Sequence, residues 1–414
     1  MLNTSTSTSA LAVAAAAAIL GCSGGAPQER GESRWWKGNL HAHSFWSDGD
    51  DYPEMVIDWY KNHGYHFIQL SEHNTLAEGE KWLEVARRGG QSVFDSYAAR
   101  FGPAWVSQRT DSAGLQVRLR TLAGYRTLFE EPNRFLILQG EEITDGFNAT
   151  PIHLNATNVL ELVAPQHGSS VQEVIQHNVD AVLEQRARSG QPMLVHLNHP
   201  NYGWAVTAED LIAVEGESFF EVYNGHPAVR NDGDEMRPST ERLWDMVLAE
   251  RLSQDMPVLF GLAVDDAHHY LDFDSDHANP GRGWIVVRAT QLAPETLIVA
   301  MESGDFYCST GVELDDLGIE NGRFFLKIRA DSDVTYTTQF IGTYSGYSDS
   351  EVGSVLAEAP GSEVSYQFRG DELYVRAKVI SSRLKSNPYR PGEFEVAWSQ
   401  PVTPTASSSP EGQD

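Results

Sequence analysis

Histidines and carboxylates lie at the ends of several predicted strands. His41 and His43 end the first extended segment, and a spacing of two residues places both imidazoles on the same side of a strand. One metal ion could therefore bind both side chains. Asp48 follows five residues after His43, in a Ser-Asp-Gly turn, and adds a carboxylate. A His-x-His pair taken alone is also found on solvent-facing strands, so a metal site needs further ligands.

Four other predicted strands run into similar clusters. Each cluster taken alone has an ordinary alternative, such as a helix-entry carboxylate or a solvated turn. The coincidence of five clusters favours a shared site, because barrels build active sites at the carboxyl ends of their strands. So many ionisable groups would repel one another without cations, and the pattern therefore predicts more than one metal ion. The four strands and their clusters are Phe67–Ser71 with Glu72-His73-Asn74, Phe135–Gln139 with Gly140-Glu141-Glu142, Met193–Leu197 with His199-Pro200, and Val258–Val264 with Asp265-Asp266-Ala267-His268.

The composition limits the kinds of site and partner. The 414 residues contain 30 Lys and Arg against 58 Asp and Glu, a formal net charge of −28. The chain also has no Lys/Arg cluster, so it lacks the basic stripe that holds phosphate backbones, and we expect no nucleic-acid partner. The only cysteines are Cys22 and Cys308, which excludes a disulfide framework and a thiolate metal cluster. The remaining nitrogen and oxygen ligands suit zinc, manganese or iron.

The pattern of apolar residues predicts an α/β fold with a second, smaller β domain. Between residues 35 and 310, short apolar runs alternate with helical stretches, which is typical of β/α units. Helices are predicted over Pro53–His63, Val171–Arg188 and Thr240–Leu252. Residues 80–131 have helical periodicity and are interpreted as an inserted helical cap. Residues 311–400 show turn-punctuated alternation, which predicts a small antiparallel β domain.

The two ends of the chain differ from the rest. Residues 1–22 are predicted to be a secretion signal, because their apolar run is shorter than the roughly 20 residues that span a bilayer. Ile19-Leu20-Gly21-Cys22 resembles a bacterial lipoprotein box, in which Cys22 carries the lipid; the alternative is an ordinary signal in which Cys22 is incidental. We therefore expect export to the periplasm or cell surface, with membrane attachment if Cys22 is lipidated. Residues 23–34 are predicted to be a tether and residues 401–414 a disordered tail.

The ordered motifs resemble those of a known metallohydrolase superfamily. They are similar to the PHP (polymerase and histidinol phosphatase) superfamily, and most of all to its secreted or lipoprotein-like branch related to carbaryl hydrolase. This resemblance covers about residues 35–310 and implies a distorted (β/α)7 barrel that holds two to three divalent metal ions. The motifs that carry it are Gly38-Asn-Leu-His41-Ala-His43-Ser-Phe-Trp-Ser-Asp48-Gly, Ser71-Glu72-His73-Asn74, Gly140-Glu141-Glu142-Ile143-Thr144, His199-Pro200 and Asp266-Ala267-His268.

The resemblance also implies a set of metal ligands, with Glu142 bridging two ions. Two alternatives stay open, since Glu141 could replace Glu142 and His196 could replace His199. Glu72 stands where Asp is commoner, and we expect it to tune the activity rather than abolish it. The implied ligands are His41, His43, Glu142 and Asp266 for the first metal, Glu142, His153 and His199 for the second, and Asp48, His73 and His268 for the third.

This ligand set implies a hydrolase in which a metal-bridging hydroxide attacks the substrate, because metal binding lowers the pKa of water toward about 7. Asp266, His196 or His226 would move protons during the reaction. Arg282 would bind a phosphate or another anion, and its alternative is a residue of a surface loop.

Three functional hypotheses remain open at this stage. The first is a metal-dependent phosphoesterase that acts on a small phosphorylated substrate. The second is a carbamate or ester hydrolase of the carbaryl-hydrolase type. Basic residues near the motifs are few, mainly Arg230 and Arg282, whereas aromatic residues such as Trp46 and Trp204 are many, so the substrate chemistry is nearly balanced between these two. The third is a non-catalytic binding module, against which the complete ligand set argues.

Overall fold

The structure, a computed structural model, describes residues 33–404 of the chain. The predicted secretion signal, Cys22, and almost all of the predicted tether and tail lie outside these residues. The described residues belong to one compact unit. None of the helices in this part of the chain combines the length and the apolar character needed to cross a membrane.

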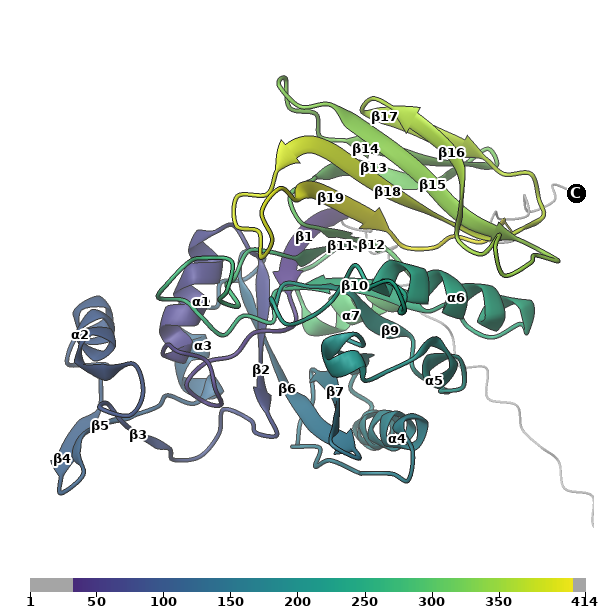
Figure 1. The fold of residues 1–414 in the computed structure, drawn as a ribbon. Coiled ribbons are helices and arrows are strands. Elements are labelled where there is room, and N and C mark those ends of the chain that lie inside the picture. Colours follow the sequence, from purple (N-terminus) through teal and green to yellow (C-terminus); the bar gives the residue numbers. More distant parts are fainter. Residues whose placement is uncertain (1–32, 405–414) are drawn as a thin grey trace, which may run out of the picture. The chain divides into compact units, whose positions relative to one another are not determined.

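Helices and strands alternate up to Ser309, and only strands follow (Figure 1). The helices are α1 Pro53–Asn62, α2 Gly90–Phe101, α3 Leu122–Phe129, α4 Val171–Ser189, α5 Ala208–Ile212, α6 Thr240–Ser253 and α7 Pro294–Glu302, with a 3-10 turn η1 at Tyr202–Trp204. The first strands are β1 Arg34–Asn39, β2 Phe67–His73, β3 Trp82–Glu84, β4 Gln108–Asp111, β5 Gly114–Arg118, β6 Leu136–Phe147, β7 Thr150–Thr157, β8 Leu194–Leu197, β9 Phe219–Asn224, β10 Phe260–Val264, β11 Trp284–Ala289 and β12 Phe306–Ser309. The later strands are β13 Leu314–Glu320, β14 Arg323–Ile328, β15 Tyr336–Tyr344, β16 Ser354–Pro360, β17 Glu363–Gln367, β18 Glu372–Leu384 and β19 Phe394–Ser399.

One large mixed sheet organises the fold, in the order β10-β9-β8-β7-β6-β2-β1-β11-β12-β19-β18-β15-β16. In its first half the pairs β10/β9, β9/β8, β6/β2 and β2/β1 are parallel, and β7 is antiparallel to both of its neighbours. An isolated parallel bridge between Ala42 and Ala267 joins the chain just after β1 to the chain just after β10. The described pairings thus connect the two ends of this seven-strand row by a single bridge. They do not form the continuous ladder that the predicted barrel implies.

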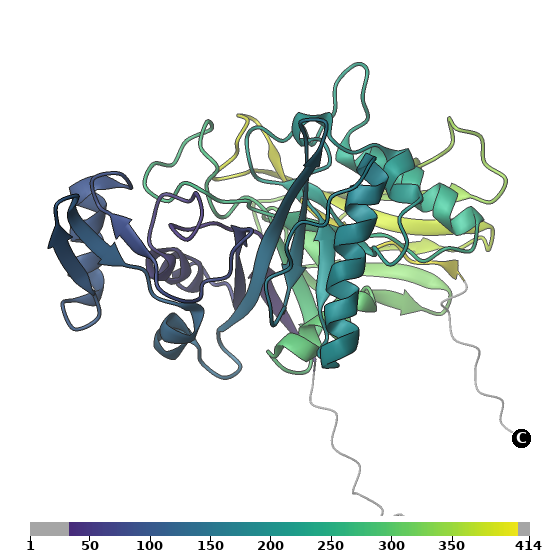
Figure 2. The ribbon, with the colours of Figure 1, turned by 90° about the horizontal axis from the view of Figure 1, so that it is seen from below.

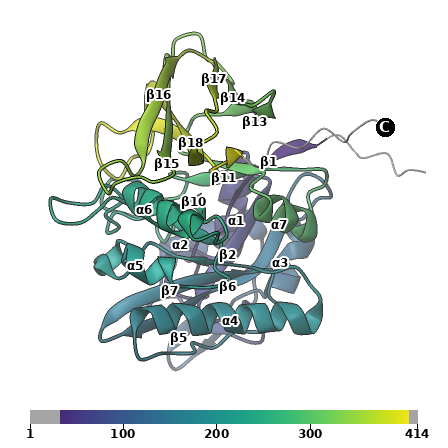
Figure 3. The ribbon, with the colours of Figure 1, turned by 90° about the vertical axis from the view of Figure 1, so that its right-hand side faces the viewer.

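Local sequence explains where the main helices begin and end. Pro53 occupies the first turn of α1, where its missing N–H costs nothing. The Ser170 side chain accepts a hydrogen bond from the Glu173 backbone N–H and starts α4, and Gly190, with a φ of 70°, ends it. Ser239 caps α6 in the same way. These bounds agree with the predicted helices to within one residue, and α4 packs against β6, β7 and β8 (Figure 3).

The inserted segment differs from the predicted all-helical cap. It contains α2 and α3, but also a three-stranded antiparallel sheet in the order β3-β5-β4 (Figure 2). All four residues of β4 are exposed, so this strand carries no apolar alternation that the sequence could show. Gly114, with a φ of 103°, permits the tight β4–β5 turn. The prediction of a wholly helical cap was therefore wrong.

The C-terminal strands continue the large sheet. β12 pairs with β19, and β18 and β15 extend the sheet beyond it, while β13, β14 and β17 form a second antiparallel sheet. A buried apolar cluster that includes Phe324, Phe340 and Val375 fills the space between the two sheets. β15 and β18 also contact α6, which ties these strands to the first half of the fold (Figure 1).

Candidate metal centre

The structure brings all nine predicted ligands together. Their nitrogen and oxygen atoms form four overlapping groups, and within each group the atoms lie no more than 4.8 Å apart. Overlap of the groups indicates room for more than one ion. The groups are His41, His43 and Glu142; His41, His199 and Asp266; His73, Glu142 and His153; and His43, Asp48, His73 and His268.

The most deeply buried ligand atoms of the cluster surround a first candidate position for a metal ion. His41 Nε2 lies 3.4 Å from Glu142 Oε2 and 3.2 Å from Asp266 Oδ1, and His43 Nε2 lies 3.3 Å from each of the same two oxygens. Ligands about 2.1 Å from a tetrahedral ion are separated by roughly 3.4 Å, so these spacings fit a shared cation. His41 Nε2, His43 Nε2 and Glu142 Oε2 are buried without a hydrogen-bond partner. Atoms of this kind are costly to bury, and a metal ion would satisfy all three.

Glu142 lies between this first candidate ion position and a second one. Its Oε1 lies 2.9 Å from His153 Nδ1 and 3.4 Å from His199 Nε2, on the side opposite to the contacts of Oε2. A carboxylate that presents one oxygen to each of two histidine groups has the arrangement of a bridging ligand. The register of the sheet explains part of this, because His73 on β2 is the direct neighbour of Glu142 on β6.

The third group lies nearer to solvent. The half-exposed Asp48 side chain approaches His73 Nε2 at 3.3 Å with Oδ2 and His268 Nε2 at 3.5 Å with Oδ1. His43 Nδ1 lies 3.6 Å from Asp48 Oδ1, so the two nitrogens of His43 face two different groups. Glu72 supports this loop by accepting hydrogen bonds of 2.5 Å from the hydroxyls of Ser44 and Ser47.

The backbone is strained at two of the ligands. Asp266 has a φ of 50° and His199 a φ of 23°, in or near the left-handed region that side-chain-bearing residues seldom adopt. A hydrogen bond of 3.0 Å from the Asp266 N–H to the His41 carbonyl holds one of these turns. The fold thus maintains unfavourable backbone conformations in order to place ligands.

Burial and mutual charge set the protonation of the cluster. Burial opposes a charge on His41, but Asp266, Glu221 and Glu142 outweigh it and raise the pKa of His41 well above its usual range. Burial also opposes ionisation of Glu142 and Asp266, yet the imidazoles, His41 first, hold the pKa of both carboxyls well below the usual range. Burial and neighbouring imidazoles lower the pKa of His43 to about 3. Ionised carboxylates and a neutral imidazole are metal-binding forms.

The geometry decides which residue of each alternative pair, Glu141 or Glu142 and His196 or His199, belongs to the cluster. Glu141 points away from the cluster, where its Oε1 accepts a 2.6 Å hydrogen bond from the Val163 N–H, and burial raises its pKa to about 8. His196 is fully buried with its Nε2 3.4 Å from Glu221 Oε1, and it belongs to none of the four groups. Glu142 and His199 are therefore the members of the cluster. His196 also lies outside the lining of the cavity, and its role in proton transfer stays a prediction.

The structure places Arg282 in contacts within the protein and not in the lining of the cavity. Its side chain is buried, and its guanidinium donates to the backbone carbonyls of Gly225, Asp274, His277 and Asn387 and to the side-chain oxygen of Asn279. These acceptors come from three separate loops, which Arg282 ties together. These contacts indicate a structural role, and the contact of Arg282 with an anion stays a prediction.

Sequence reasoning missed Glu221 on β9. Its Oε1 lies 2.6 Å from His41 Nδ1, and its Oε2 accepts hydrogen bonds from the His199 N–H at 2.7 Å and from Asn224 Nδ2 at 2.8 Å. Asn224 also donates to Asp266 Oδ2 at 3.1 Å. The sequence signal that could have pointed to Glu221 is its position as the single carboxylate within the fully buried strand Phe-Phe-Glu-Val-Tyr-Asn. Such a residue orients the metal ligands from behind.

A cavity of about 310 Å³ opens onto the cluster. Besides the ligands, its walls consist of Tyr202, His226 and His269, and no Lys or Arg belongs to the lining. His226 packs edge-to-face against His268, with 5.6 Å between ring centres, and is the one predicted proton-transfer histidine that reaches this cavity.

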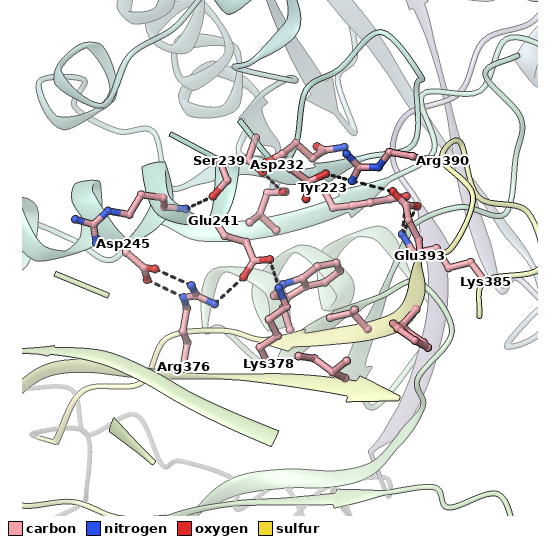
Figure 4. Close-up of a pocket in the computed structure, with 18 of the residues that line it drawn as sticks. Tyr223, Asp232, Ser239, Glu241, Asp245, Arg376, Lys378, Lys385, Arg390 and Glu393 are labelled. Atoms are coloured by element: carbon pink, nitrogen blue, oxygen red, sulfur yellow. Dashed lines mark hydrogen bonds and ion pairs between the residues drawn. The ribbon is translucent and has the colours of Figure 1, made fainter. Parts of the chain in front are cut away.

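A second cavity of about 590 Å³ lies between α6 and the strands β18 and β19 (Figure 4). Its charged side chains are largely paired with one another. Most of the pairs join the C-terminal strands to α6 or to the loop after β9, so we interpret this region as an interface that holds the two halves of the fold together. The pairs are Arg376–Asp245, Lys378–Glu241, Lys385–Glu393 and Arg390–Asp232.

Several solved structures match this chain, and two of them are described here as weak structural neighbours. One is a two-domain protein containing a predicted PHP-like metal-dependent phosphoesterase from Bacteroides vulgatus, with a TM-score of 0.41 and 14% identity over 89% of this chain and 95% of that chain. The other, provisionally named a metal-dependent phosphoesterase, is from Bifidobacterium adolescentis, with a TM-score of 0.30 and 14% identity over 57% of this chain and 89% of that chain. No family model and no curated protein matches the sequence.

These neighbours are too distant to assign a function, and neither is described as a carbaryl hydrolase. The assignment therefore depends on the cluster itself. The fold and the site define a mixed α/β protein with a candidate multinuclear centre of imidazole and carboxylate ligands.

Proposed function

We propose that the protein is a metal-dependent phosphoesterase that acts on a small phosphorylated substrate. The observation that carries this proposal is the position of Glu142, whose Oε2 faces His41 and His43 and whose Oε1 faces His153 and His199. We propose as the ligands His41, His43, Asp48, His73, Glu142, His153, His199, Asp266 and His268, which would hold two to three ions of zinc, manganese or iron. Ions bound there would supply an activated water and neutralise charge on the reacting phosphoryl group.

The chain's own residues would orient the substrate and donate a hydrogen bond to it. His226 Nδ1 accepts a hydrogen bond from the Ala228 N–H at 3.0 Å, which places the proton of the neutral ring on Nε2. Burial lowers the pKa of His226 to about 4, so the ring is neutral at pH 7. A neutral imidazole with its proton on Nε2 can donate a hydrogen bond to an oxygen of the substrate at the cavity wall and so stabilise charge that develops there. Tyr202, whose ring packs against His199 and His226, shapes the same wall.

A carbamate or ester hydrolase is the second candidate. The cavity wall favours it in one respect, because the described lining has no Lys or Arg and includes the aromatic ring of Tyr202. An uncharged substrate needs no cation besides the metal ions. A non-catalytic binding module is the third candidate.

One experiment separates these candidates. The protein lacking residues 1–22 is analysed for metal content and assayed in parallel with p-nitrophenyl phosphate and 1-naphthyl carbamate. We expect two to three equivalents of metal and phosphate release that falls by about 1,000-fold in Glu142→Gln, equivalent to about 4 kcal/mol. His63→Ala, which changes an exposed histidine outside the cluster, is the matched control.

The outcomes of that experiment are distinct. Carbamate cleavage without phosphate release would replace the first candidate by the second. Less than one equivalent of metal after reconstitution, with no turnover of either compound, would leave only the binding module.

We also propose export of the protein and lipid attachment through Cys22. The support is the apolar run followed by Leu20-Gly21-Cys22 in the sequence. Expression in a bacterial host with labelled palmitate tests this, since labelling should disappear in Cys22→Ser. Export without labelling of the original chain would favour an ordinary secretion signal.

A further inference from the structure

Two arginines lie over the ring of one tryptophan next to the cavity. The guanidinium carbons of Arg237 and Arg230 are 4.5 Å and 5.2 Å from the centre of the Trp204 ring. A cation over an indole face is stabilised, but two like charges on one ring also repel each other. An anion between or beside them would relieve that repulsion.

The loops that carry these residues form the rim of the metal cavity. Trp204 ends the turn that follows β8, five residues after His199, and Arg230 follows β9 by six residues. Asn201 joins the two loops by donating from Nδ2 to the Arg230 carbonyl at 2.9 Å. Tyr202 and His226, one from each loop, both line the cavity, with 6.3 Å between their ring centres.

The backbone holds Trp204 in an unfavourable conformation. Its φ is 57°, and that of Gly203 is 60°. Residues with a side chain seldom adopt this left-handed conformation, because the Cβ atom then crowds the backbone. Strain of this kind persists where the surrounding structure fixes it and is concentrated at ligand-binding sites.

The Arg230 side chain is exposed, and its positive charge is not paired with a carboxylate of the described residues. In the part of the chain that the structure describes, no carboxylate lies within ion-pair distance of the Arg230 guanidinium. Arg237 has only a 4.0 Å contact with Asp234, and both of those side chains are more than two-fifths exposed. The cavity lining has no Lys or Arg, and Arg230 and Arg237 are the basic residues of the two loops that border the cavity.

We propose that Arg230, assisted by Arg237, binds a second anionic group of the substrate, several ångströms from the phosphate that reacts. This inference rests on the proposed phosphoesterase function and narrows its substrate class to phosphorylated molecules that bear a further carboxylate or phosphate. Arg230 is then a specificity-determining residue. Trp204 supports the guanidinium and leaves its N–H groups free to donate to the anion.

A matched pair of ligands tests the proposal. 6-Phosphogluconate and glucitol 6-phosphate differ only by a carboxylate in place of a hydroxymethyl group at the end remote from the phosphate. Each is used as a competitor of p-nitrophenyl phosphate hydrolysis by the metal-loaded protein, which reports binding whether or not the competitor is itself hydrolysed. We expect 6-phosphogluconate to bind the original protein at least 10-fold more tightly.

The variant Arg230→Gln should remove that difference. We expect it to weaken 6-phosphogluconate binding by about 10-fold or more, as the loss of one charge-assisted hydrogen bond would do, and to leave glucitol 6-phosphate and the kcat for p-nitrophenyl phosphate within twofold. Arg369→Gln is the matched control, because Arg369 also lies over an aromatic ring, that of Tyr344, but in the C-terminal strands.

Two results would overturn the inference while the proposed function stands. One is equal binding of the two competitors to the original protein, and the other is an equal loss for both competitors in Arg230→Gln. Absence of p-nitrophenyl phosphate hydrolysis by the metal-loaded original protein contradicts the proposed function itself, and the inference falls with it.

Discussion

Glu221 Oε1 lies 2.6 Å from His41 Nδ1, and both side chains are completely buried. This contact fixes the imidazole so that its other nitrogen, Nε2, faces Glu142 and Asp266. Glu221 also accepts a hydrogen bond from the His199 N–H, so one carboxylate positions two members of the cluster.

Replacement of Glu221 should therefore weaken metal binding without removing a ligand. In Glu221→Gln the side chain keeps its shape, but the acceptor at His41 Nδ1 loses its charge. We expect metal affinity to fall by about 10- to 100-fold, the range typical of residues that support metal-bound histidines. Titration of the metal-free protein with Zn²⁺ or Mn²⁺ measures this.

The control for that titration is Glu217→Gln. Glu217 is also buried, just before β9, but it contacts none of the proposed ligands. Equal affinities of Glu221→Gln and the original protein would show that Glu221 does not position the cluster.

Removal of metal should lower the stability of the fold. Without ions, His41 Nε2, His43 Nε2 and Glu142 Oε2 are buried with no partner. Each site filled at 100 times its Kd contributes about 2.7 kcal/mol to the free energy of unfolding. We expect dialysis against a chelator to lower Tm and re-addition of metal to restore it. A Tm that is the same with and without chelator would argue that the cluster is unoccupied in solution.

Glu217 should make stability depend on pH. Burial raises its pKa to about 8 in the folded protein, against about 4.5 for an unfolded glutamate. Between these values the folded state keeps a proton that the unfolded state has lost, so the free energy of unfolding falls as pH rises from about 5 to 8. The fall attributable to this group is about 1.4 kcal/mol per pH unit.

The variant Glu217→Gln isolates that contribution. It keeps the acceptor for the Phe219 N–H and cannot ionise. We expect the variant to gain stability relative to the original protein progressively from pH 5 to pH 8 in urea unfolding curves. A difference between the two proteins that is constant over this range would contradict the assignment.

The buried pair Arg376–Asp245 should stabilise the junction between the C-terminal strands and α6. Arg376 Nη2 lies 2.7 Å from Asp245 Oδ2, and its Nε donates to Asp245 Oδ1 at 2.8 Å (Figure 4). Arg376→Met leaves a buried carboxylate without its cation, and we expect a loss of about 3–5 kcal/mol in urea unfolding.

An exposed arginine provides the comparison. Arg383 pairs with Asp331 at the surface, and Arg383→Met should cost about 1 kcal/mol or less. Similar losses in the two variants would show that the junction does not depend on the buried pair.

The sequence by itself placed most of the candidate ligands at the ends of predicted strands. The family resemblance added His153, and the choices between Glu141 and Glu142 and between His196 and His199 stayed open. His41 and His43 alternate on one short segment, and His73, Glu142 and Asp266 come at the ends of apolar runs. These are local features, and the carboxyl ends of neighbouring parallel strands meet at one edge of a sheet, so local position was enough to predict convergence. The helices α1, α4 and α6 were predictable for the same reason, because their caps and periodicity lie within each segment.

Only the tertiary structure decided the roles of residues whose contact partners are distant in sequence. Glu221 gains its role from His41, 180 residues away, and the Arg282 guanidinium donates to carbonyls as far away as Asn387. His196 and His199 are three residues apart, yet the turn after β8 turns only His199 into the cluster. The β4 strand was hidden because both of its faces are exposed. Periodicity reports which face of a segment is buried, whereas the partner of a buried charge is set by packing between elements.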